Sequence, residues 1–243
     1  VVVGGGLLGL EAAKALKDLG LETHVVEFAP RLMAVQVDDG GGKVLRKKIA
    51  ELGVGIHTER NTVEITDGEK CLHVMKFSDG TSLETDMILF SAGIRPRDDI
   101  ARNNGIAVGA RGGIVVDNFC RTNAPDVYAI GECALWEGKI YGLVAPGYQM
   151  ADVACTHILG GQDKEFLGAD MSTKLKLLGV DVASIGDAHG VTAGSINYSY
   201  VDERTQTYKK IVVSADGKKL LGAVLIGDVE AYGDLLQLKL NDM

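Results

Sequence analysis

The sequence predicts an α/β fold over its N-terminal part and a separate α+β domain at its C-terminal end. Two observations support this expectation. In residues 1–57, apolar runs typical of buried strands alternate with segments of helical periodicity. After about residue 163, strand-like stretches with alternating β-branched residues follow one another. The length of 243 residues is sufficient for one large domain or two smaller ones with their own cores.

A glycine-rich motif lies at the start of the chain. Val1–Val3 is typical of a buried strand, and Gly-x-Gly-x-x-Gly over Gly4–Gly9 and a helical pattern follow it without a loop. In such a motif the first glycine permits a tight turn, the second lets backbone N–H groups approach a diphosphate, and the third lets the helix pack on the strand. The helix directs its positive end at the phosphates. We therefore assign the following residues to dinucleotide binding: Gly4, Gly5, Gly6, Leu7, Leu8 and Gly9.

The residues after the motif support this assignment. The helix is expected to end at Gly20, and a second strand, Thr23–Glu27, follows. Glu27 comes 23 positions after Gly4 (27 minus 4), near the spacing of about 20 at which such motifs carry an acid. A carboxylate there accepts a hydrogen bond from the adenosine ribose 2′-hydroxyl and repels a 2′-phosphate. The sequence therefore predicts a Rossmann-like NADH-binding domain that prefers NADH over NADPH. Arg31, also assigned to the cofactor site, leaves that preference open, and an ordinary glycine-rich turn with a solvated Glu27 is the alternative.

The remaining patterns predict three domains. Residues 1–92 continue with a helix and a strand, expected at Val44–Leu52 and Val54–His57. An antiparallel meander and a buried strand are then expected at Thr62–Thr66, Leu72–Phe77, Ser82–Glu84 and Asp86–Gly93, with a turn at Asp79–Gly80. Residues 93–162 are expected to hold strands at Gly113–Val116 and Val127–Ile130 and a helix at Tyr148–Leu159. Residues 163–243 are expected to form an α+β interface or docking domain with strands at Ser195–Val201, Tyr208–Ser214 and Leu220–Ile226.

Composition excludes several classes of function. Charged residues make up 24% of the chain and the net charge is −8, without a lysine–arginine cluster, which argues against nucleic acid or an anionic membrane as a partner. No apolar stretch approaches the roughly 20 residues of a membrane span, and no signal peptide is apparent. The four cysteines and five histidines are scattered, so we expect reduced thiols, a cytoplasmic location and no metal site. Because the chain starts inside a strand and without methionine, we expect it to be the interior of a longer polypeptide.

Three segments resemble, in order, the pyridine nucleotide-disulfide oxidoreductase superfamily. Gly4–Ala13 is similar to its NADH fingerprint, Ser91–Pro96 to the Ala-Thr-Gly element between the NADH and FAD domains, and Thr122–Cys133 to its flavin-contacting Gly-Asp motif. The resemblance implies hydride transfer from a nicotinamide to FAD. It makes residues 93–162 a partial FAD-binding domain and adds these residues to the cofactor sites: Ala92, Gly93, Gly131 and Glu132. Glu132 stands where the superfamily usually has Asp, and its alternative role is that of an acid at a helix N-terminus.

Within the superfamily, three further segments resemble the large subunits of assimilatory NAD(P)H nitrite reductases. They are Phe28–Met33, Gly142–Tyr148 and Lys174–Val182. The resemblance implies a cytoplasmic enzyme that reduces nitrite to ammonia, with electrons passing from NADH through FAD and iron-sulfur clusters to siroheme. This chain would supply only the NADH-to-FAD part; siroheme and iron-sulfur clusters would belong to downstream domains or subunits of the complete protein. The first glycine motif of the superfamily, near which its redox-active cysteines lie where they are present, does not occur in this chain, so the resemblance implies that the FAD site here is incomplete.

Several alternatives stay open at this point. By likeness to the family, Glu11 lies near the nicotinamide, or it is a first-turn acid that favours the helix dipole. The chain could instead belong to an NADH-dependent ferredoxin or rubredoxin reductase, or be a non-enzymatic NADH-binding redox sensor. The C-terminal domain suggests an interface, and a homodimer is one open possibility. Asp187–Gly190 is expected to form a loop turn.

Overall fold

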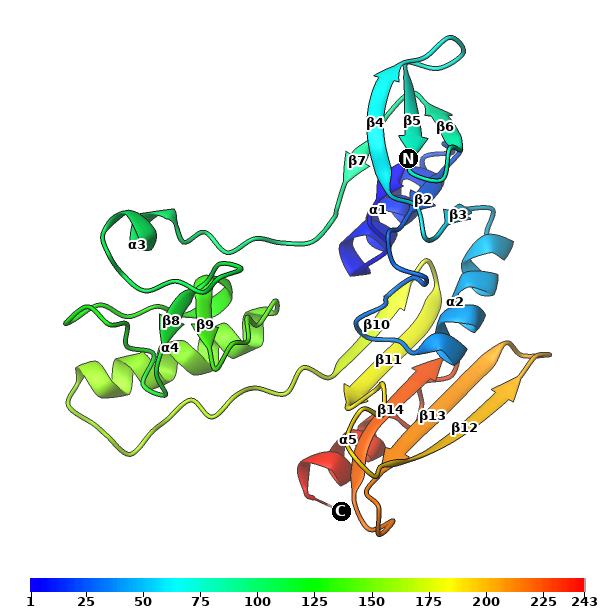
Figure 1. The fold of residues 1–243 in the computed structure, drawn as a ribbon. Coiled ribbons are helices and arrows are strands. Elements are labelled where there is room, and N and C mark those ends of the chain that lie inside the picture. Colours follow the sequence, from blue (N-terminus) through cyan, green and yellow to red (C-terminus); the bar gives the residue numbers. More distant parts are fainter. Residues whose placement is uncertain (243) are drawn as a thin grey trace. The chain divides into compact units, whose positions relative to one another are not determined.

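The computed structural model describes residues 1–242 and divides them into two compact units (Figure 1). One unit combines residues 1–93 with residues 172–242, and the other contains residues 94–171. The N-terminal and C-terminal parts of the chain therefore fold together, and the middle part forms its own unit.

The first unit begins with a parallel sheet of four strands in the order β3-β2-β1-β7. The strands are β1 Val2–Val3, β2 His24–Val26, β3 Gly55–His57 and β7 Leu89–Phe90, and the helices are α1 Leu7–Asp18 and α2 Asp39–Glu51. Gly20, with φ +79°, follows the end of α1 as expected. The alternation of strands and helices confirms the predicted Rossmann-like α/β fold.

A three-stranded antiparallel meander follows β3. Its strands are β4 Thr62–Asp67, β5 His73–Phe77 and β6 Ser82–Thr85, with Gly80 at φ +84° in the predicted turn. Met75 and Phe77 of β5 pack with Val1 and Val26 in a small core of their own. The meander thus lies against the parallel sheet.

The C-terminal part of the first unit is a five-stranded antiparallel sheet in the order β10-β11-β14-β13-β12. Its strands are β10 Thr173–Leu177, β11 Val180–Gly186, β12 Ile196–Asp202, β13 Thr207–Val213 and β14 Leu220–Ile226. Helix α5, Tyr232–Leu240, packs on one face. The predicted α+β class is confirmed, although the sequence analysis did not identify β10, β11 or α5.

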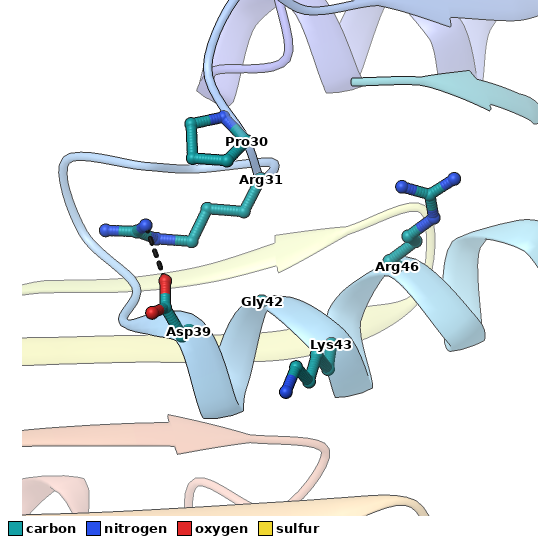
Figure 2. A pocket seen from close by; sticks show the side chains of 6 residues that line it. All are labelled: Pro30, Arg31, Asp39, Gly42, Lys43 and Arg46. Carbon is teal, nitrogen blue, oxygen red and sulfur yellow. Dashed lines mark hydrogen bonds and ion pairs between the residues drawn. The ribbon is translucent and has the colours of Figure 1, made fainter. Parts of the chain in front are cut away.

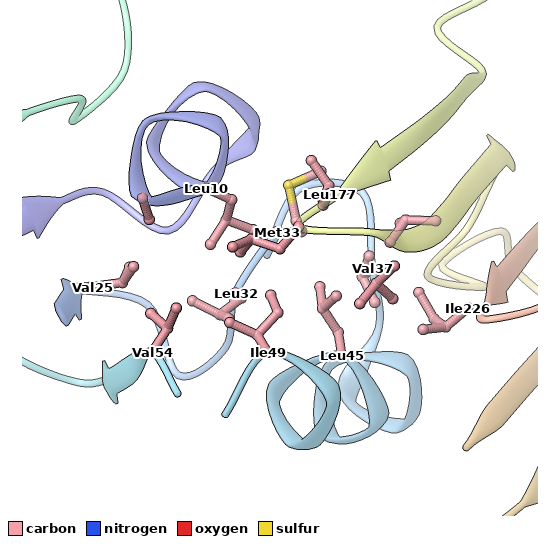
Figure 3. Packing of buried hydrophobic residues seen from close by; sticks show 14 of the residues in the cluster. Leu10, Val25, Leu32, Met33, Val37, Leu45, Ile49, Val54, Leu177 and Ile226 are labelled. Carbon is pink, nitrogen blue, oxygen red and sulfur yellow. The ribbon is translucent and has the colours of Figure 1, made fainter. Parts of the chain in front are cut away.

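The other face of this sheet shares one hydrophobic core with the Rossmann-like fold (Figure 3). Buried residues from α1, α2 and the segment after β2 contact buried residues of the sheet; among them are Leu10, Leu32, Met33, Val37, Leu45, Ile49, Leu177, Val224 and Ile226. Helix α2 approaches the sheet closely, because a Cβ on Gly40 would lie 2.6 Å from the ring of Tyr208. The two parts are therefore joined by a continuous apolar interior.

Helix α2 begins earlier than the sequence predicted. It starts at Asp39, whereas the prediction placed its start at Val44. Glycine has poor helix propensity, and the run Gly40–Gly42 conceals this first turn in the sequence. Asp38 caps the helix by accepting a hydrogen bond from the Gly41 N–H.

The second unit contains three helical segments and two strands among residues 94–171. They are α3 Asp99–Asn103, β8 Ile114–Val116, η1 Gly131–Cys133, β9 Ala134–Trp136 and α4 Val144–Ile158, with β8 and β9 parallel. Helix α4 begins before the predicted Tyr148, because Pro146 occupies its first turn, where a backbone N–H is not needed. The core contains Trp136 and Phe166, whose rings meet edge to face.

The predicted strand at Val127–Ile130 is wrong. Apart from an isolated bridge between Arg121 and Tyr128, this segment has no strand pairing, and β9 is the partner of β8 instead. Asp126 has φ +59°, and Thr122 and Val127 close a turn through a 2.9 Å backbone hydrogen bond. This hydrogen bond and the one from the Ala129 N–H to the Cys120 carbonyl oxygen form the isolated bridge, which no further pairing extends into a strand.

Within residues 1–242, no helix has the length and apolar character needed to cross a membrane.

The shared core yields a prediction about stability. Leu45→Ala removes a fully buried side chain of α2, and we expect it to lower the free energy of unfolding by about 2–5 kcal/mol through lost burial and a residual cavity. Leu19→Ala, at a residue that is 75% exposed, is the control and should change stability by less than about 0.5 kcal/mol. Urea denaturation monitored by circular dichroism measures both; equal effects of the two variants would contradict the core assignment.

Candidate functional site

The fold itself requires glycine at both ends of the glycine motif. Gly4 has φ +119°, and a Cβ there would lie 2.1 Å from the carbonyl oxygen of Ser91. A Cβ on Gly9 would lie 1.9 Å from the carbonyl oxygen of Gly4, because α1 packs directly on the turn that precedes it. A side chain at Gly9 would force α1 away from β1, and one at Gly4 would collide with the backbone at Ser91.

Gly6 is different from the other glycines of the motif. Its φ is −81°, and a Cβ there would meet no atom of the described chain within 4 Å. By contrast, a Cβ on Gly5 would lie 2.7 Å from the side chain of Leu32. Neither backbone conformation nor packing therefore explains glycine at position 6.

The N-terminus of α1 carries free backbone donors next to Gly6. Gly6 is the N-cap residue, and no side chain caps the helix. The first N–H groups of a helix, here those of Leu7, Leu8 and Gly9, have no intrahelical acceptor. The positive end of the helix dipole adds to their attraction for an anion. This arrangement is suited to binding a phosphate group.

Glu27 lies beside the glycine loop. It follows β2, and one of its carboxylate oxygens accepts a hydrogen bond from the Gly5 N–H at 2.5 Å. The other oxygen accepts one from the Ala29 N–H at 2.7 Å. A carboxylate offers about four acceptor positions, so Glu27 can accept further hydrogen bonds from a ribose. The structure thus brings Glu27 into contact with the glycine loop, as their spacing in the sequence predicted.

The segment Ser91–Gly93 reaches the same place from β7. The Ser91 N–H donates a 2.7 Å hydrogen bond to the carbonyl oxygen of Val3, and Gly4 packs against Ser91. Ala92 is exposed. Gly93 has φ +93° and a Cβ there would meet nothing within 4 Å, so its backbone conformation alone accounts for glycine. The roles of Ala92 and Gly93 in cofactor binding stay predictions.

Arg31 has structural partners in the segment that follows β2. Its Nε donates to the carbonyl oxygen of Val37 at 2.8 Å, and its Nη1 forms a 2.7 Å ion pair with Asp39. Its aliphatic stem packs on Gly42 of α2. It also lines a pocket of about 440 Å³ together with Pro30, Asp39, Gly42, Lys43 and Arg46 (Figure 2). The guanidinium therefore fixes this segment, and its role as a cofactor ligand stays a prediction.

Glu11 is exposed on α1, in the second turn of the helix. The expectation that it lies in the first turn is wrong, because the helix begins at Leu7 and its first turn contains no acid. A stabilising effect of Glu11 on the helix dipole is correspondingly weaker. Its position near the nicotinamide stays a prediction.

Gly131 and Glu132 lie in the second unit. Gly131 has φ +72° and opens η1, and its N–H contacts the sulfur of Met150 at 3.3 Å. A Cβ on Gly147 would lie 3.3 Å from the Cα of Gly131, so this turn packs closely on α4. Glu132 is exposed, and a helical segment of only three residues offers it little dipole to stabilise. Contact of both residues with a flavin stays a prediction.

A pair of histidines lies next to Glu27 at the edge of the parallel sheet. His24 Nδ1 and His57 Nε2 are 3.0 Å apart and share a hydrogen bond. The His57 carbonyl oxygen accepts a 2.8 Å hydrogen bond from the Glu27 N–H. Burial lowers the pKa of His57, and the nearby charges of His24, Arg60 and Arg46 lower it further.

The described residues contain neither a candidate metal site nor a disulfide. In residues 1–242 no three His, Cys, Asp or Glu side chains are grouped so that they could hold a metal ion. The four cysteines are free, and burial raises the pKa of Cys120 to about 11, so its thiol stays protonated at neutral pH.

The chain belongs to the pyridine nucleotide-disulphide oxidoreductase family, which residues 1–157 match. Membership of this family implies FAD and NAD(P)H as cofactors. Residues 172–239 match a second family, the rubredoxin NAD+ reductase C-terminal domain. The family resemblance that the sequence motifs predicted is confirmed.

Two curated relatives show which members of the family this chain is similar to. The chain is 65% identical to the nitrite reductase [NAD(P)H] large subunit of Klebsiella oxytoca over 243 residues, which is all of this chain and 25% of the relative. It is 60% identical over 241 residues to the nitrite reductase (NADH) large subunit of Escherichia coli K12, covering 99% of this chain and 28% of the relative. The chain thus spans about a quarter of the length of these relatives.

Solved structures show the same fold. An FAD-dependent pyridine nucleotide-disulphide oxidoreductase from Desulfovibrio vulgaris superposes with a TM-score of 0.79 and 26% identity, over 99% of this chain and 62% of that one. The predicted resemblance to nitrite reductase large subunits is confirmed by these sequence identities, and the predicted fold by this superposition.

The lowered pKa of His57 predicts a pH dependence of stability. Between the folded-state pKa and the unfolded value of about 6.5, the unfolded chain binds more protons at this site, so stability falls as the pH drops below about 6.5. His57→Gln should therefore lose less stability than the wild type between about pH 7.5 and 5.5. Carboxylates with lowered pKa values, such as Asp187, take up protons on unfolding only below about pH 4, so they do not change the stability between about pH 7.5 and 5.5. Urea midpoints at both pH values measure the difference, and an identical pH dependence of the two proteins would refute this role.

Proposed function

We propose that this chain binds NADH at Gly4–Gly9 and Glu27 and forms the NADH-to-FAD electron-transfer part of a nitrite reductase large subunit. The observation that carries the NADH site is Gly6, because the fold does not explain glycine there and the free N–H groups of α1 surround it. The identity of 65% over the whole chain with the Klebsiella oxytoca large subunit supports the assignment to nitrite reductases.

The residues of the site favour NADH over NADPH. The Glu27 carboxylate lies on the glycine loop, where it would accept hydrogen bonds from the adenosine ribose and repel a 2′-phosphate. Arg31, the nearest residue after Glu27 that could attract such a phosphate, is held by Val37 and Asp39. Both features point to the unphosphorylated cofactor.

The protein's task in this reaction is to bind the two cofactors and orient them. A bound nicotinamide donates a hydride and a flavin accepts it, so the chemistry belongs to the cofactors. The first turn of α1 would hold the diphosphate through Leu7 and Leu8 N–H groups, and Glu27 would hold the ribose. Gly131 and Glu132 would contribute to a flavin site that other parts of the protein complete. Siroheme, iron-sulfur clusters and reduction of nitrite to ammonia in the cytoplasm are proposals for the complete protein.

A second candidate is an NADH-dependent rubredoxin or ferredoxin reductase. It is favoured by the match of residues 172–239 to the rubredoxin NAD+ reductase C-terminal domain. The sequence of the complete gene separates the two candidates, because a siroheme domain belongs only to the nitrite reductase.

Substitution of Gly6 tests the nucleotide site. Gly6→Ala adds a methyl group without a clash in the described chain, so the fold should persist while NADH affinity falls about ten-fold or more, because the methyl group blocks the diphosphate. Gly233→Ala is a matched control, since a Cβ there also meets nothing within 4 Å. Titration by nucleotide fluorescence and circular dichroism measure binding and fold. Wild-type affinity in Gly6→Ala, or a folded wild type that binds neither nucleotide, would overturn the site.

Substitution of Glu27 tests the cofactor preference. Glu27→Arg replaces the carboxylate beside Gly5 by a cation, so we expect weaker binding of NADH and tighter binding of NADPH, with the preference shifting by about ten-fold or more. Glu69→Arg makes the same charge change at an exposed residue of the meander and serves as the control. Parallel NADH and NADPH titrations measure the ratio, and an unchanged ratio in Glu27→Arg removes Glu27 from this role.

A further inference from the structure

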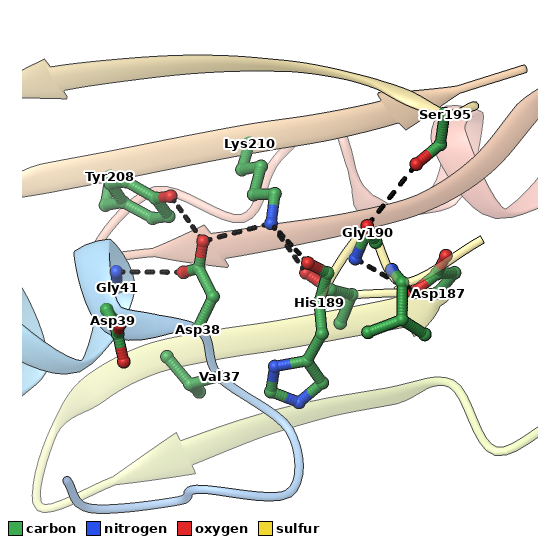
Figure 4. A network of polar contacts seen from close by, with 12 residues as sticks. Val37, Asp38, Asp39, Gly41, Asp187, His189, Gly190, Ser195, Tyr208 and Lys210 are labelled. Carbon is green, nitrogen blue, oxygen red and sulfur yellow. Dashed lines mark hydrogen bonds and ion pairs between the residues drawn. The ribbon is translucent and has the colours of Figure 1, made fainter. Parts of the chain in front are cut away.

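A buried lysine connects the C-terminal sheet to the Rossmann-like part of the first unit (Figure 4). Lys210 of β13 is only 6% exposed. Its ammonium group lies 3.1 Å from the Asp38 carboxylate and donates to the carbonyl oxygens of Ala188 at 3.1 Å and His189 at 3.2 Å. An ammonium group has three donors, so every donor of Lys210 has an acceptor. A fully buried lysine is rare unless it is paired in this way.

Asp38 is the meeting point of helix α2 and strand β13. One carboxylate oxygen accepts a 3.1 Å hydrogen bond from the Gly41 N–H and caps the helix. The other accepts a 2.8 Å hydrogen bond from the Tyr208 hydroxyl in addition to the ion pair with Lys210. Burial raises the pKa of Asp38, but the hydrogen bonds from Gly41, Tyr208 and Lys210 outweigh it and hold that pKa below its usual value. Asp38 is therefore a charged anchor at neutral pH.

A second connection runs through the loop after β11. Asp187 accepts hydrogen bonds from the N–H groups of Gly190, Val191 and Thr192, which closes the loop as the turn that the sequence analysis expected. His189 in this loop donates from Nε2 to the carbonyl oxygen of Val35 at 2.9 Å. The C-terminal sheet thus holds the segment 33–38 at two points.

The other end of this segment contacts the glycine loop. The Met33 N–H donates a 2.8 Å hydrogen bond to the carbonyl oxygen of Gly5, and Met33 has φ +51°. The neighbouring Leu32 side chain packs against Gly5, whose own N–H is bound by Glu27. The segment 33–38 therefore links the anchor at Asp38 directly to the residues proposed to bind NADH.

We propose that Lys210 and Tyr208 are positioning residues of the dinucleotide site, which they act on through Asp38, the segment 33–38 and the Met33–Gly5 hydrogen bond. This inference rests on the proposed binding of NADH at Gly4–Gly9. When the anchor is removed, the segment and the glycine loop sample other conformations, and the apparent affinity falls in proportion to the fraction that stays competent to bind. The C-terminal sheet would thereby control nucleotide affinity without touching the nucleotide.

The test compares two adjacent lysines of β13 in the whole 243-residue chain. Lys210→Met removes the buried charge but keeps an unbranched side chain, and we expect the Kd for NADH to rise about five-fold or more. Lys209→Met is the matched control: Lys209 pairs with Asp228, on the opposite face of the strand, and its replacement should leave the Kd unchanged. Both are measured at a temperature where circular dichroism shows the native fold.

Two further variants keep the test decisive if Lys210→Met does not fold. Asp38→Asn retains an acceptor for the Gly41 N–H but loses the ion pair, and Tyr208→Phe loses only the hydroxyl donor. Each should raise the Kd in the same direction, with the smaller effect for Tyr208→Phe. A lower melting temperature with a wild-type Kd in these variants would assign the network to stability alone and overturn the proposal.

Hydrogen exchange separates this proposal from that of NADH binding. In Lys210→Met, peptides that contain Gly5 and Met33 should exchange faster than in the wild type and in Lys209→Met. If the wild type binds no NADH, the proposed function fails, whereas unchanged exchange in these peptides overturns the bracing of the loop whether or not NADH binds.

Discussion

The contact between Gly4 and Gly9 is the constraint on which the rest of the N-terminal fold depends. A Cβ on Gly9 would lie 1.9 Å from the Gly4 carbonyl oxygen, so α1 can lie directly on the end of β1 only because residue 9 is glycine, while Gly4 itself is required by its φ of +119° and its contact with Ser91. This close approach aims the free N–H groups of the first helical turn at the space beside Gly6. It also places Leu10 and Ala13 of α1 in the core. Phosphate-binding geometry and core packing are therefore consequences of the same contact.

Most of this arrangement could be predicted from the sequence because its signals are local. The glycine motif, the spacing to Glu27 and the helix stop at Gly20 all lie within 27 residues. Each depends on a residue type that is visible in the sequence: glycine for the backbone geometry and an acid for the hydrogen bonds. The first turn of α2 could not be predicted, because Gly40 and Gly41 weaken the helical signal locally, and these glycines are explained by close packing against Tyr208, Val224 and Val37. Local propensity was overridden there by a contact with a sheet far along the chain.

The residues of the candidate site also differ in how well the sequence predicts them. Gly6 and Glu27 follow from the motif. Arg31 is predicted as a cofactor residue from its proximity in the sequence, and the sequence gives no sign of its contacts with Val37 and Asp39. Lys210 was missed, although a signal was present. In the alternating strand β13 it stands on the same face as Tyr208 and Val212, both buried, and a lysine at a core-facing position indicates a buried acidic partner. That partner, Asp38, is too distant in sequence to be identified without the fold.

The two segments of this chain that match different families share one hydrophobic core. Residues 1–157 and 172–239 match different families, yet Leu32, Met33 and Val37 from the first pack against Leu177 and Ile226 from the second in one cluster. Without the C-terminal sheet, this cluster would lose part of its apolar cover, and each fully buried side chain of this size contributes about 1.5–3 kcal/mol by burial. The same segment supplies the Met33 N–H that binds Gly5. The glycine loop therefore belongs to a structure whose interior is built from both matched segments, and the Rossmann-like fold is not independent of the sheet that follows it.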